Sequence, residues 1–291
     1  MKIGLMIEGQ EGVSWEQWLA IAESAERAGL ESLFRSDHYR SIALGEPAGS
    51  LDAWATLAAL AARTERIRLG TLVSPVTFRP AAVLAKNVVT VDHVSGGRIE
   101  LGIGAGWYEP EHDTYGFPFG TVGSRLDELD RQLAEIIRQW TVADDVLPRP
   151  VQQPRPPIIV GGRGRPRTLA SAVRFADEYN LVTPSVEEAA QCAGALAEAA
   201  HAADRGPLRL SMLAGCIVGA DATEVGERLA SYRALTGNPD GTPQLVGTVD
   251  EIVARLEEYE AAGVERAMLR HLDHADVAMI AGLGEVAARL R

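Results

Sequence analysis

The chain has 291 residues, of which 46% are hydrophobic and 23% are charged, so a large buried core is possible and disorder is not expected. Its 40 acidic and 28 basic residues give a formal charge of −12 at pH 7, which argues against binding of nucleic acid through general electrostatics. The two cysteines exclude a disulfide scaffold and a four-thiolate metal site, and no apolar run approaches the ~20 residues that span a membrane.

Short apolar runs alternate with longer amphipathic segments along the whole chain. The apolar runs predict eight strands, over residues 2–8, 32–35, 67–73, 98–104, 157–160, 178–182, 208–218 and 266–271. The amphipathic segments predict helices over residues 14–29, 51–63, 80–97, 122–140, 166–176, 185–203, 222–234 and 248–263, and from residue 275. The proline-rich stretch 144–157 predicts an extended connector rather than a domain boundary. An acidic residue at position 8 comes too early for the core of a signal peptide, so we expect a cytoplasmic protein.

Eight strands that are each followed by a helix can form an open sheet or a closed barrel. A doubly wound open sheet usually carries a glycine fingerprint just after its first strand, and the segment from Glu8 to Gly12 does not match one. Eight repeats at this length favour a closed barrel. We therefore predict the α/β class and a single (β/α)8 TIM-type barrel over residues 1–291, with modest loop insertions and with its chemistry at the carboxyl ends of the strands.

The sharpest polar cluster follows the second predicted strand, where Asp37 precedes His38. A histidine at such a strand end can transfer protons near neutral pH, and a neighbouring acid can orient its ring. The alternative is that Asp37 only caps a turn and that His38 only hydrogen-bonds the loop. Schiff-base chemistry is not expected, because neither of the two lysines lies at the carboxyl end of a strand: Lys2 opens the first strand, and Lys86 lies within a helix.

A metal centre is not expected, because the strand ends do not bring several histidines together. His271 and His274 are three residues apart and would share a metal only on a helix. A Ser-His-Asp hydrolase is not expected either, because the sequence has no Gly-x-Ser-x-Gly turn.

A glycine- and arginine-rich loop follows the fifth predicted strand and is the best candidate for anion binding. Glycines let backbone amides turn towards a ligand, and the amino terminus of the following helix favours negative charge. The candidate phosphate-binding residues are Gly161, Gly162, Arg163, Gly164, Arg165 and Thr168. An exposed glycine turn with solvated arginines is the alternative. A second glycine-rich stretch, from Gly102 to Trp107, lacks the spacing of a dinucleotide fingerprint and would instead let a large, flat group approach the backbone.

Five segments in order, spread over nearly the whole chain, together resemble the luciferase-like monooxygenase superfamily, specifically its branch that uses the deazaflavin coenzyme F420. The segments are residues 25–38 (AERAGLESLFRSDH), 68–74 (RLGTLVS), 96–107 (GGRIELGIGAGW), 156–164 (PPIIVGGRG) and 247–252 (GTVDEI).

The resemblance implies a cofactor ring at the carboxyl end of the barrel and a cofactor phosphate at the loop after the fifth strand. It implies that Asp37 and His38 act beside the ring, with His38 handling the proton. It also implies a bulge with a non-prolyl cis peptide bond at one of the bonds between Leu72 and Ser74. The further cofactor-binding candidates at the third and fourth strands are Leu72, Val73, Ser74, Gly104, Ala105 and Gly106.

The sequence departs from the sugar-phosphate dehydrogenases of the family in two ways. Trp107 stands where those enzymes have a catalytic glutamate, and their phosphate-binding lysines have no counterpart. Both departures argue against oxidation of glucose 6-phosphate. Trp107, Tyr108 and Phe78 suggest an apolar, planar substrate, or else packing of a lid. The substrate-contact candidates are Glu8, Phe78, Trp107 and His271.

These observations lead to the hypothesis of an F420-dependent oxidoreductase that transfers a hydride to or from an unidentified small, apolar organic substrate. Two alternatives stay open, an FMN-dependent monooxygenase of the same fold and a non-catalytic flavin-binding protein. We expect a homodimer, with the helices after strands two and three as candidate contact surfaces.

Overall fold

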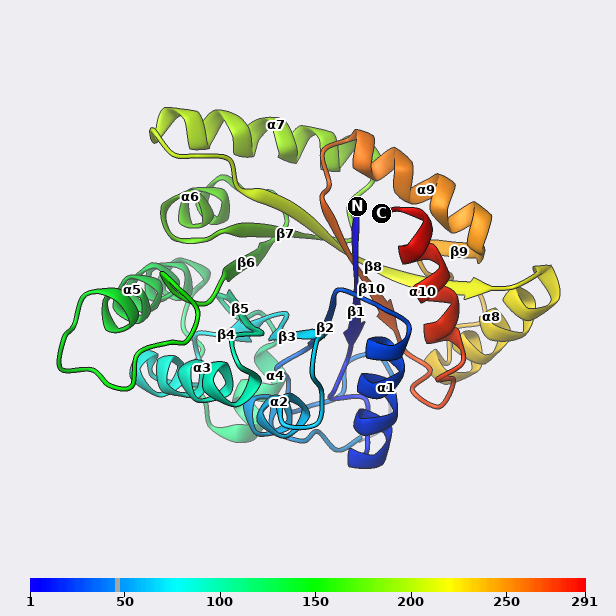
Figure 1. The fold of residues 1–291 in the computed structure, drawn as a ribbon, viewed down its shortest axis with the longest axis horizontal. Coiled ribbons are helices and arrows are strands. Elements are labelled where there is room, and N and C mark those ends of the chain that lie inside the picture. Colours follow the sequence, from blue (N-terminus) through cyan, green and yellow to red (C-terminus); the bar gives the residue numbers. More distant parts are fainter. Residues whose placement is uncertain (45–47) are drawn as a thin grey trace.

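Eight parallel strands form a closed barrel in the computed structural model, which describes residues 1–44 and 48–291 (Figure 1). The barrel strands are β1 (Lys2–Ile7), β2 (Ser32–Arg35), β3 (Arg68–Thr71), β5 (Ile99–Gly104), β6 (Ile158–Gly162), β7 (Glu178–Val182), β8 (Arg209–Gly219) and β10 (Arg266–His271). Each strand pairs with the next in this order, and β10 pairs with both β8 and β1, which closes the ring. The predicted fold class is therefore confirmed.

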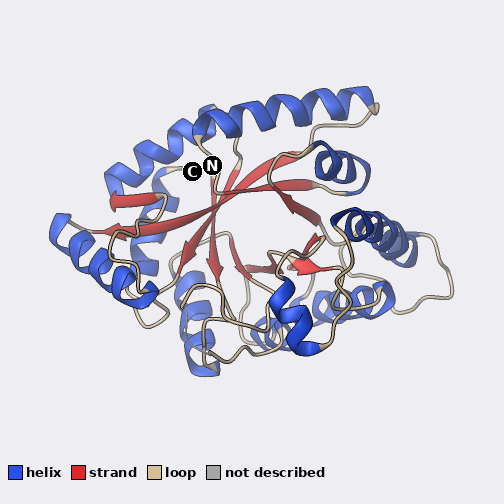
Figure 2. Ribbon diagram, turned by 180° about the vertical axis from the view of Figure 1, so that it is seen from behind, coloured by secondary structure: helices blue, strands red, loops and turns tan. Residues whose placement is uncertain are grey.

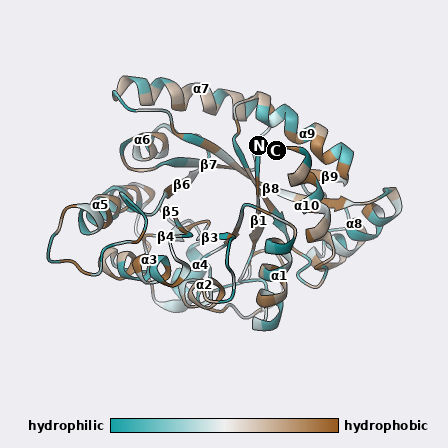
Figure 3. Ribbon diagram, viewed as in Figure 1, coloured by the Kyte–Doolittle hydropathy of each residue, from teal (hydrophilic) through white to brown (hydrophobic). Residues whose placement is uncertain are grey.

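Helices surround the strands on the outside of the barrel (Figure 2). They are α1 (Trp15–Arg27), α2 (Ala53–Ala61), α3 (Ala81–Ser95), α4 (Glu109–Tyr115), α5 (Val122–Thr141), α6 (Pro166–Phe175), α7 (Val186–Ala202), α8 (Ala222–Thr236), α9 (Val249–Ala261) and α10 (Met279–Arg289). Capping boxes at Ser14, Ser185 and Thr248 open α1, α7 and α9, as the sequence predicts. Hydrophobic and hydrophilic residues are interspersed along these outer helices, because only one face of each packs on the barrel (Figure 3).

Three short elements were absent from the sequence prediction. β4 (Ser74–Pro75) pairs with β5 just beyond the end of β3, and β9 (Leu245–Thr248) pairs with the last residues of β8. The third element is α4, which lies between β5 and α5 and bears on the candidate site.

Side chains that point into the barrel form layers, because successive residues of a strand alternate between its two faces. The amino-terminal layer holds an ion network in which Arg266 contacts Glu100 and Glu178, each at 2.7 Å, and Glu31 at 3.1 Å. The middle layer is apolar and consists of Met6, Phe34, Leu72, Ile159, Leu213 and Met268. At the carboxyl end of the barrel, Glu8 and Arg270 lie 3.4 Å apart.

Both ends of the chain meet on one side of the barrel (Figure 1), where the amino group of Met1 donates to the backbone oxygen of Leu290 at 2.8 Å. Over the two described ranges, no helix combines the length and the apolar character needed to cross a membrane.

Candidate active site

His38 follows β2 at the carboxyl end of the barrel, and a buried carboxylate holds its ring. Its Nδ1 lies 2.6 Å from Oε1 of Glu111, and Oε2 of Glu111 accepts a hydrogen bond from the backbone nitrogen of Tyr39 at 3.0 Å. Burial disfavours the charged imidazole, but the hydrogen bond and the charge of Glu111 outweigh it and raise the pKa of His38. Because Glu111 occupies Nδ1, the other ring nitrogen, Nε2, is left to exchange a proton with a ligand. The described residues form no hydrogen bond with Nε2.

Asp37 belongs to a separate network. Its carboxylate accepts from Ser74 Oγ at 2.6 Å and from Arg79 at 2.7 and 3.2 Å. The guanidinium of Arg79 also donates to Asp52 at 2.8 Å and to the hydroxyl of Tyr39 at 3.0 Å, and the charges of the two aspartates raise its pKa in spite of burial. The acid that orients His38 is therefore Glu111, and the expectation that the neighbouring Asp37 does so is corrected. Asp37 instead fixes the loop after β2 to Arg79.

The bulge after β3 carries a cis peptide bond between Leu72 and Val73, at one of the positions that the resemblance implies. Glycines in the neighbouring strands make room for this bulge. A Cβ atom on Gly104 or Gly161 would lie 2.7 or 3.0 Å from the side chain of Val73, and one on Gly102 would overlap the backbone oxygen of Thr71. These glycines are explained by packing within the barrel, so they are not by themselves evidence for a flat ligand.

The glycine- and arginine-rich loop joins β6 to α6. Gly164, with φ of +67°, donates from its backbone nitrogen to the hydroxyl of Tyr179 at 2.9 Å, and Thr168 Oγ1 lies 2.9 Å from the same hydroxyl. A Cβ on Gly162 would overlap that hydroxyl, so Gly162 accommodates Tyr179. Tyr179 thus sets the shape of the loop from beneath.

The three arginines of this loop differ in their partners. Arg167 forms ion pairs with Asp127 at 2.9 Å and with Asp130 at 2.6 Å, both on α5. Arg163 and Arg165 are exposed and form no ion pair with any residue in the described part of the chain. Their charges, together with the amino terminus of α6, are therefore available to an anion.

The segment after β5 places two aromatic rings beside His38. Ala105 and Gly106, which has φ of +80°, lead to Trp107, a residue that is 63% exposed. The rings of Trp107 and Tyr108 meet His38 edge-on, with centroids 6.0 and 6.3 Å away. Trp107 is thus positioned to contact a ligand that reaches His38.

Phe78 is buried in an aromatic cluster rather than presented to a ligand. It stacks on Phe117 at 4.5 Å and on Tyr39 at 5.2 Å, and the same cluster includes Tyr115 and His112. Of the two interpretations of Phe78, contact with a substrate and packing, the structure favours packing, here against His112 and Phe117.

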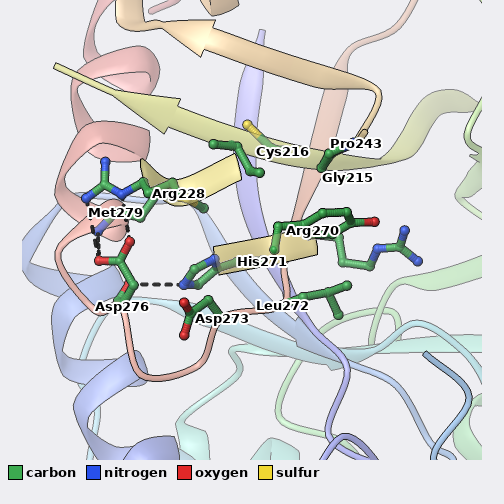
Figure 4. A pocket seen from close by; sticks show the side chains of 12 residues that line it. Gly215, Cys216, Arg228, Pro243, Arg270, His271, Leu272, Asp273, Asp276 and Met279 are labelled. Carbon is green, nitrogen blue, oxygen red and sulfur yellow. Dashed lines mark hydrogen bonds and ion pairs between the residues drawn. The ribbon is translucent and has the colours of Figure 1, made fainter. Parts of the chain in front are cut away.

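The last candidates lie at the ends of β1 and β10. Glu8 points into the barrel, where its Oε2 accepts from Gln10 at 3.0 Å and its Oε1 lies 3.4 Å from Arg270. His271 points the other way, with its Nε2 3.0 Å from the backbone oxygen of Asp276, and burial lowers its pKa (Figure 4). It lines a cavity of about 20 Å³, the size of one water molecule, so its placement does not support contact with a substrate.

Four residues of the site were not identified from the sequence: Arg79, Glu111, Tyr179 and Arg270. Glu111 lies 73 positions from its partner His38, and contacts of that range leave no trace in a single sequence. Arg270 did leave a signal, because residues 266, 268 and 270 share one face of a predicted strand.

In the described ranges, no three His, Cys, Asp or Glu side chains are grouped as a metal site would require.

The chain and its fold are similar to known proteins. The model of the luciferase-like monooxygenase family matches residues 1–243. An uncharacterized protein of Mycobacterium tuberculosis, Rv0953c, is 35% identical over 146 residues, which are 46% of this chain and 51% of that protein. The FMNH(2)-dependent dimethylsulfone monooxygenase of Pseudomonas putida is 30% identical over 186 residues, which are 57% of this chain and 48% of that protein. The matched parts thus span about half the length of these curated relatives.

A solved structure of an F420-dependent secondary alcohol dehydrogenase, in complex with an F420-acetone adduct, superposes with a TM-score of 0.81. The superposition covers 100% of this chain and 99% of that chain, at 20% sequence identity, and so establishes a common fold. From the family match over residues 1–243, the chain belongs to the luciferase-like monooxygenase family.

Proposed function

We propose that this protein is an oxidoreductase that transfers a hydride between coenzyme F420 and a small organic substrate. The observation that carries the proposal is the His38–Glu111 pair beside the Leu72–Val73 bulge, at the end of the barrel where such folds place their chemistry. A buried carboxylate that holds one ring nitrogen and raises the pKa of the imidazole is the arrangement a proton-transferring histidine needs.

The residues at the carboxyl end fit a cofactor with an anionic tail. Arg163, Arg165 and the amino terminus of α6 would hold its phosphate, and Thr168 would add a hydroxyl. Leu72, Val73 and Ser74, together with the turn formed by Gly104, Ala105 and Gly106, would contact the ring. When bound, a deazaflavin would supply or accept the hydride.

The protein's own part in the reaction is proton transfer and orientation. His38 would give or take the accompanying proton at Nε2, while Glu111 keeps the Nδ1 side of the ring fixed. Trp107 and Tyr108 would place the apolar part of the substrate against the edge of the imidazole. The Asp37–Arg79 ion pair would keep the loop that carries His38 in place.

Turnover of reduced F420 with a panel of organic electron acceptors tests this proposal. We expect oxidation of the cofactor that depends on both the acceptor and His38. A protein that binds F420 and turns over none of the acceptors would favour the non-catalytic flavin-binding alternative.

An FMN-dependent monooxygenase is the second candidate, and the similarity to the dimethylsulfone monooxygenase favours it. The loop of Arg163 and Arg165 would hold the phosphate of FMN equally well. Titration with each cofactor separates the two candidates.

We also propose a homodimer that forms through α2 and α3. The outer face of α3 exposes Val83 and Val94 at 48% and 45%, and these two side chains would offer a second copy of the chain an apolar contact. Light scattering should give twice the chain mass for the wild type and the mass of a single chain for Val83→Glu combined with Val94→Glu. A monomeric wild type would contradict the proposal.

A further inference from the structure

Arg270 is a second arginine on the inner face of β10, at the opposite end of the barrel from Arg266. Residues 266, 268 and 270 alternate inward: Arg266 reaches the amino-terminal ion network, and Met268 belongs to the apolar middle layer. Arg270 therefore points inward in the carboxyl-terminal layer, and Figure 4 shows its guanidinium directed away from the outward-facing ring of His271. Across from it on β8 stands Gly215, where a side chain would lie against the guanidinium.

The donors of Arg270 are largely unused. Its Nε is buried and has no hydrogen-bond partner in the described structure, and its side chain is 29% exposed. Among the described residues its one ionic contact is with Glu8, at 3.4 Å, whereas Arg266 contacts three glutamates and Arg79 contacts two aspartates. A guanidinium carries five N–H donors in a planar fork, so most of this fork can accept a ligand.

Glu8 does not neutralise Arg270 fully. The distance of 3.4 Å is long for a charge-assisted hydrogen bond, and the second oxygen of Glu8 accepts from Gln10. Glu8 therefore holds the guanidinium loosely, and a second anion in bidentate geometry would compete with it.

We infer that Arg270 is the anchor for a carboxylate group on the substrate. A carboxylate matches the planar fork with two parallel hydrogen bonds, and the side chain of Arg270 is 29% exposed and can receive it. β1 lies between β10 and β2 in the barrel, so Arg270 and His38 bracket the same end of β1. The inference rests on the proposed function and refines its substrate: a small organic acid with an apolar body for Trp107 and a carboxylate for Arg270.

The test compares binding of benzoate with binding of its neutral analogue benzamide, by calorimetry and by saturation-transfer NMR. The wild type should bind benzoate about 10- to 100-fold more tightly, as expected for hydrogen bonds to a charged group. Arg270→Met should lose this preference, and Arg270→Lys should retain part of it, because it keeps the charge without the fork. Glu8→Gln should strengthen benzoate binding, because it removes the competing anion. Arg63→Met, which changes an exposed arginine without ion pairs in the described part of the chain, should have no effect.

Three results would overturn the inference: no preference for benzoate in the wild type, no detectable benzoate binding, or an unchanged preference in Arg270→Met. If Arg270→Met does not fold, Arg270→Lys and Glu8→Gln give the same decision, since they should shift benzoate binding in opposite directions.

The measurement is repeated after addition of F420, which separates this inference from the proposed function. Arg270-dependent benzoate binding in a protein that does not bind F420 would leave the inference standing and reject the cofactor. Displacement of benzoate by F420 would assign the guanidinium to the cofactor and overturn the inference.

Discussion

Arg266 and Arg270 lie four residues apart on the same face of β10, yet their surroundings are opposite in kind. Arg266 is fully buried and bridges glutamates from two other strands, and their charges raise its pKa although burial opposes this. Arg270 is partly exposed, and within residues 1–44 and 48–291 it has one long ionic contact and no partner for its Nε. The polar layer around Arg266 is therefore closed and stabilises the barrel, whereas the polar layer around Arg270 is open and can bind a ligand.

The closed layer should be the more sensitive of the two to loss of charge. Arg266→Met removes the buried cation shared by Glu100 and Glu178, which keep only the partly exposed Arg68 and Arg209 as partners, so we expect the free energy of unfolding to fall by about 3–5 kcal/mol. Urea unfolding followed by circular dichroism measures this, with Arg63→Met as a control that should stay within about 0.5 kcal/mol of the wild type. If Arg266→Met lowers the free energy of unfolding by less than about 1 kcal/mol, the ion network around Arg266 does not stabilise the barrel as proposed.

In the open layer the largest effect should be on turnover. His38→Ala removes the proposed proton donor or acceptor and should slow oxidation of reduced F420 about 100-fold or more, with little change in the unfolding midpoint. Steady-state kinetics with an accepted substrate checks this. Unchanged turnover in His38→Ala would remove the role assigned to this residue.

Glu111→Gln should have a smaller effect, because the amide oxygen can still accept the Nδ1 proton. The variant loses the carboxylate charge that raises the pKa of His38, whereas burial, which lowers that pKa, remains. We expect about a tenfold loss of turnover. The pH at which turnover changes should also move towards acid, because the protonated ring persists only to a lower pH. A pH–rate profile that keeps its midpoint would contradict the positioning role of Glu111.

The smallest effect concerns the phosphate loop. Arg165→Met should weaken F420 binding about threefold, which is typical of an exposed ion pair. Arg167→Met is the matched control, because its guanidinium already pairs with Asp127 and Asp130. Fluorescence titration checks both variants, and an equal loss in the two would place the phosphate elsewhere.

The sequence predicts the barrel well because its evidence is local: alternation within strands, amphipathic helices and the capping boxes at Ser14, Ser185 and Thr248. It predicts the site only in part. His38 and the loop from Gly161 to Thr168 are found because they directly follow strands.

Contacts between distant segments are what a single sequence cannot supply. The partner of His38 comes from α4, an element whose residues show no helical periodicity. The sequence also does not show that Gly104 makes room for Val73, because this depends on where the bulge directs the side chain of Val73. The substrate contact at His271 stays a prediction made from residue type, whereas strand alternation selects Arg270 as the inward-facing residue at this end of β10.

The proposal that this protein uses F420 is tested most sharply by a parallel titration of the purified protein with F420 and with FMN, followed by fluorescence. If the protein uses F420, it should bind F420 saturably, and this binding should weaken in Arg165→Met and be retained in Arg167→Met. Micromolar binding of FMN together with no detectable binding of F420 would contradict it and establish the monooxygenase alternative as the better one.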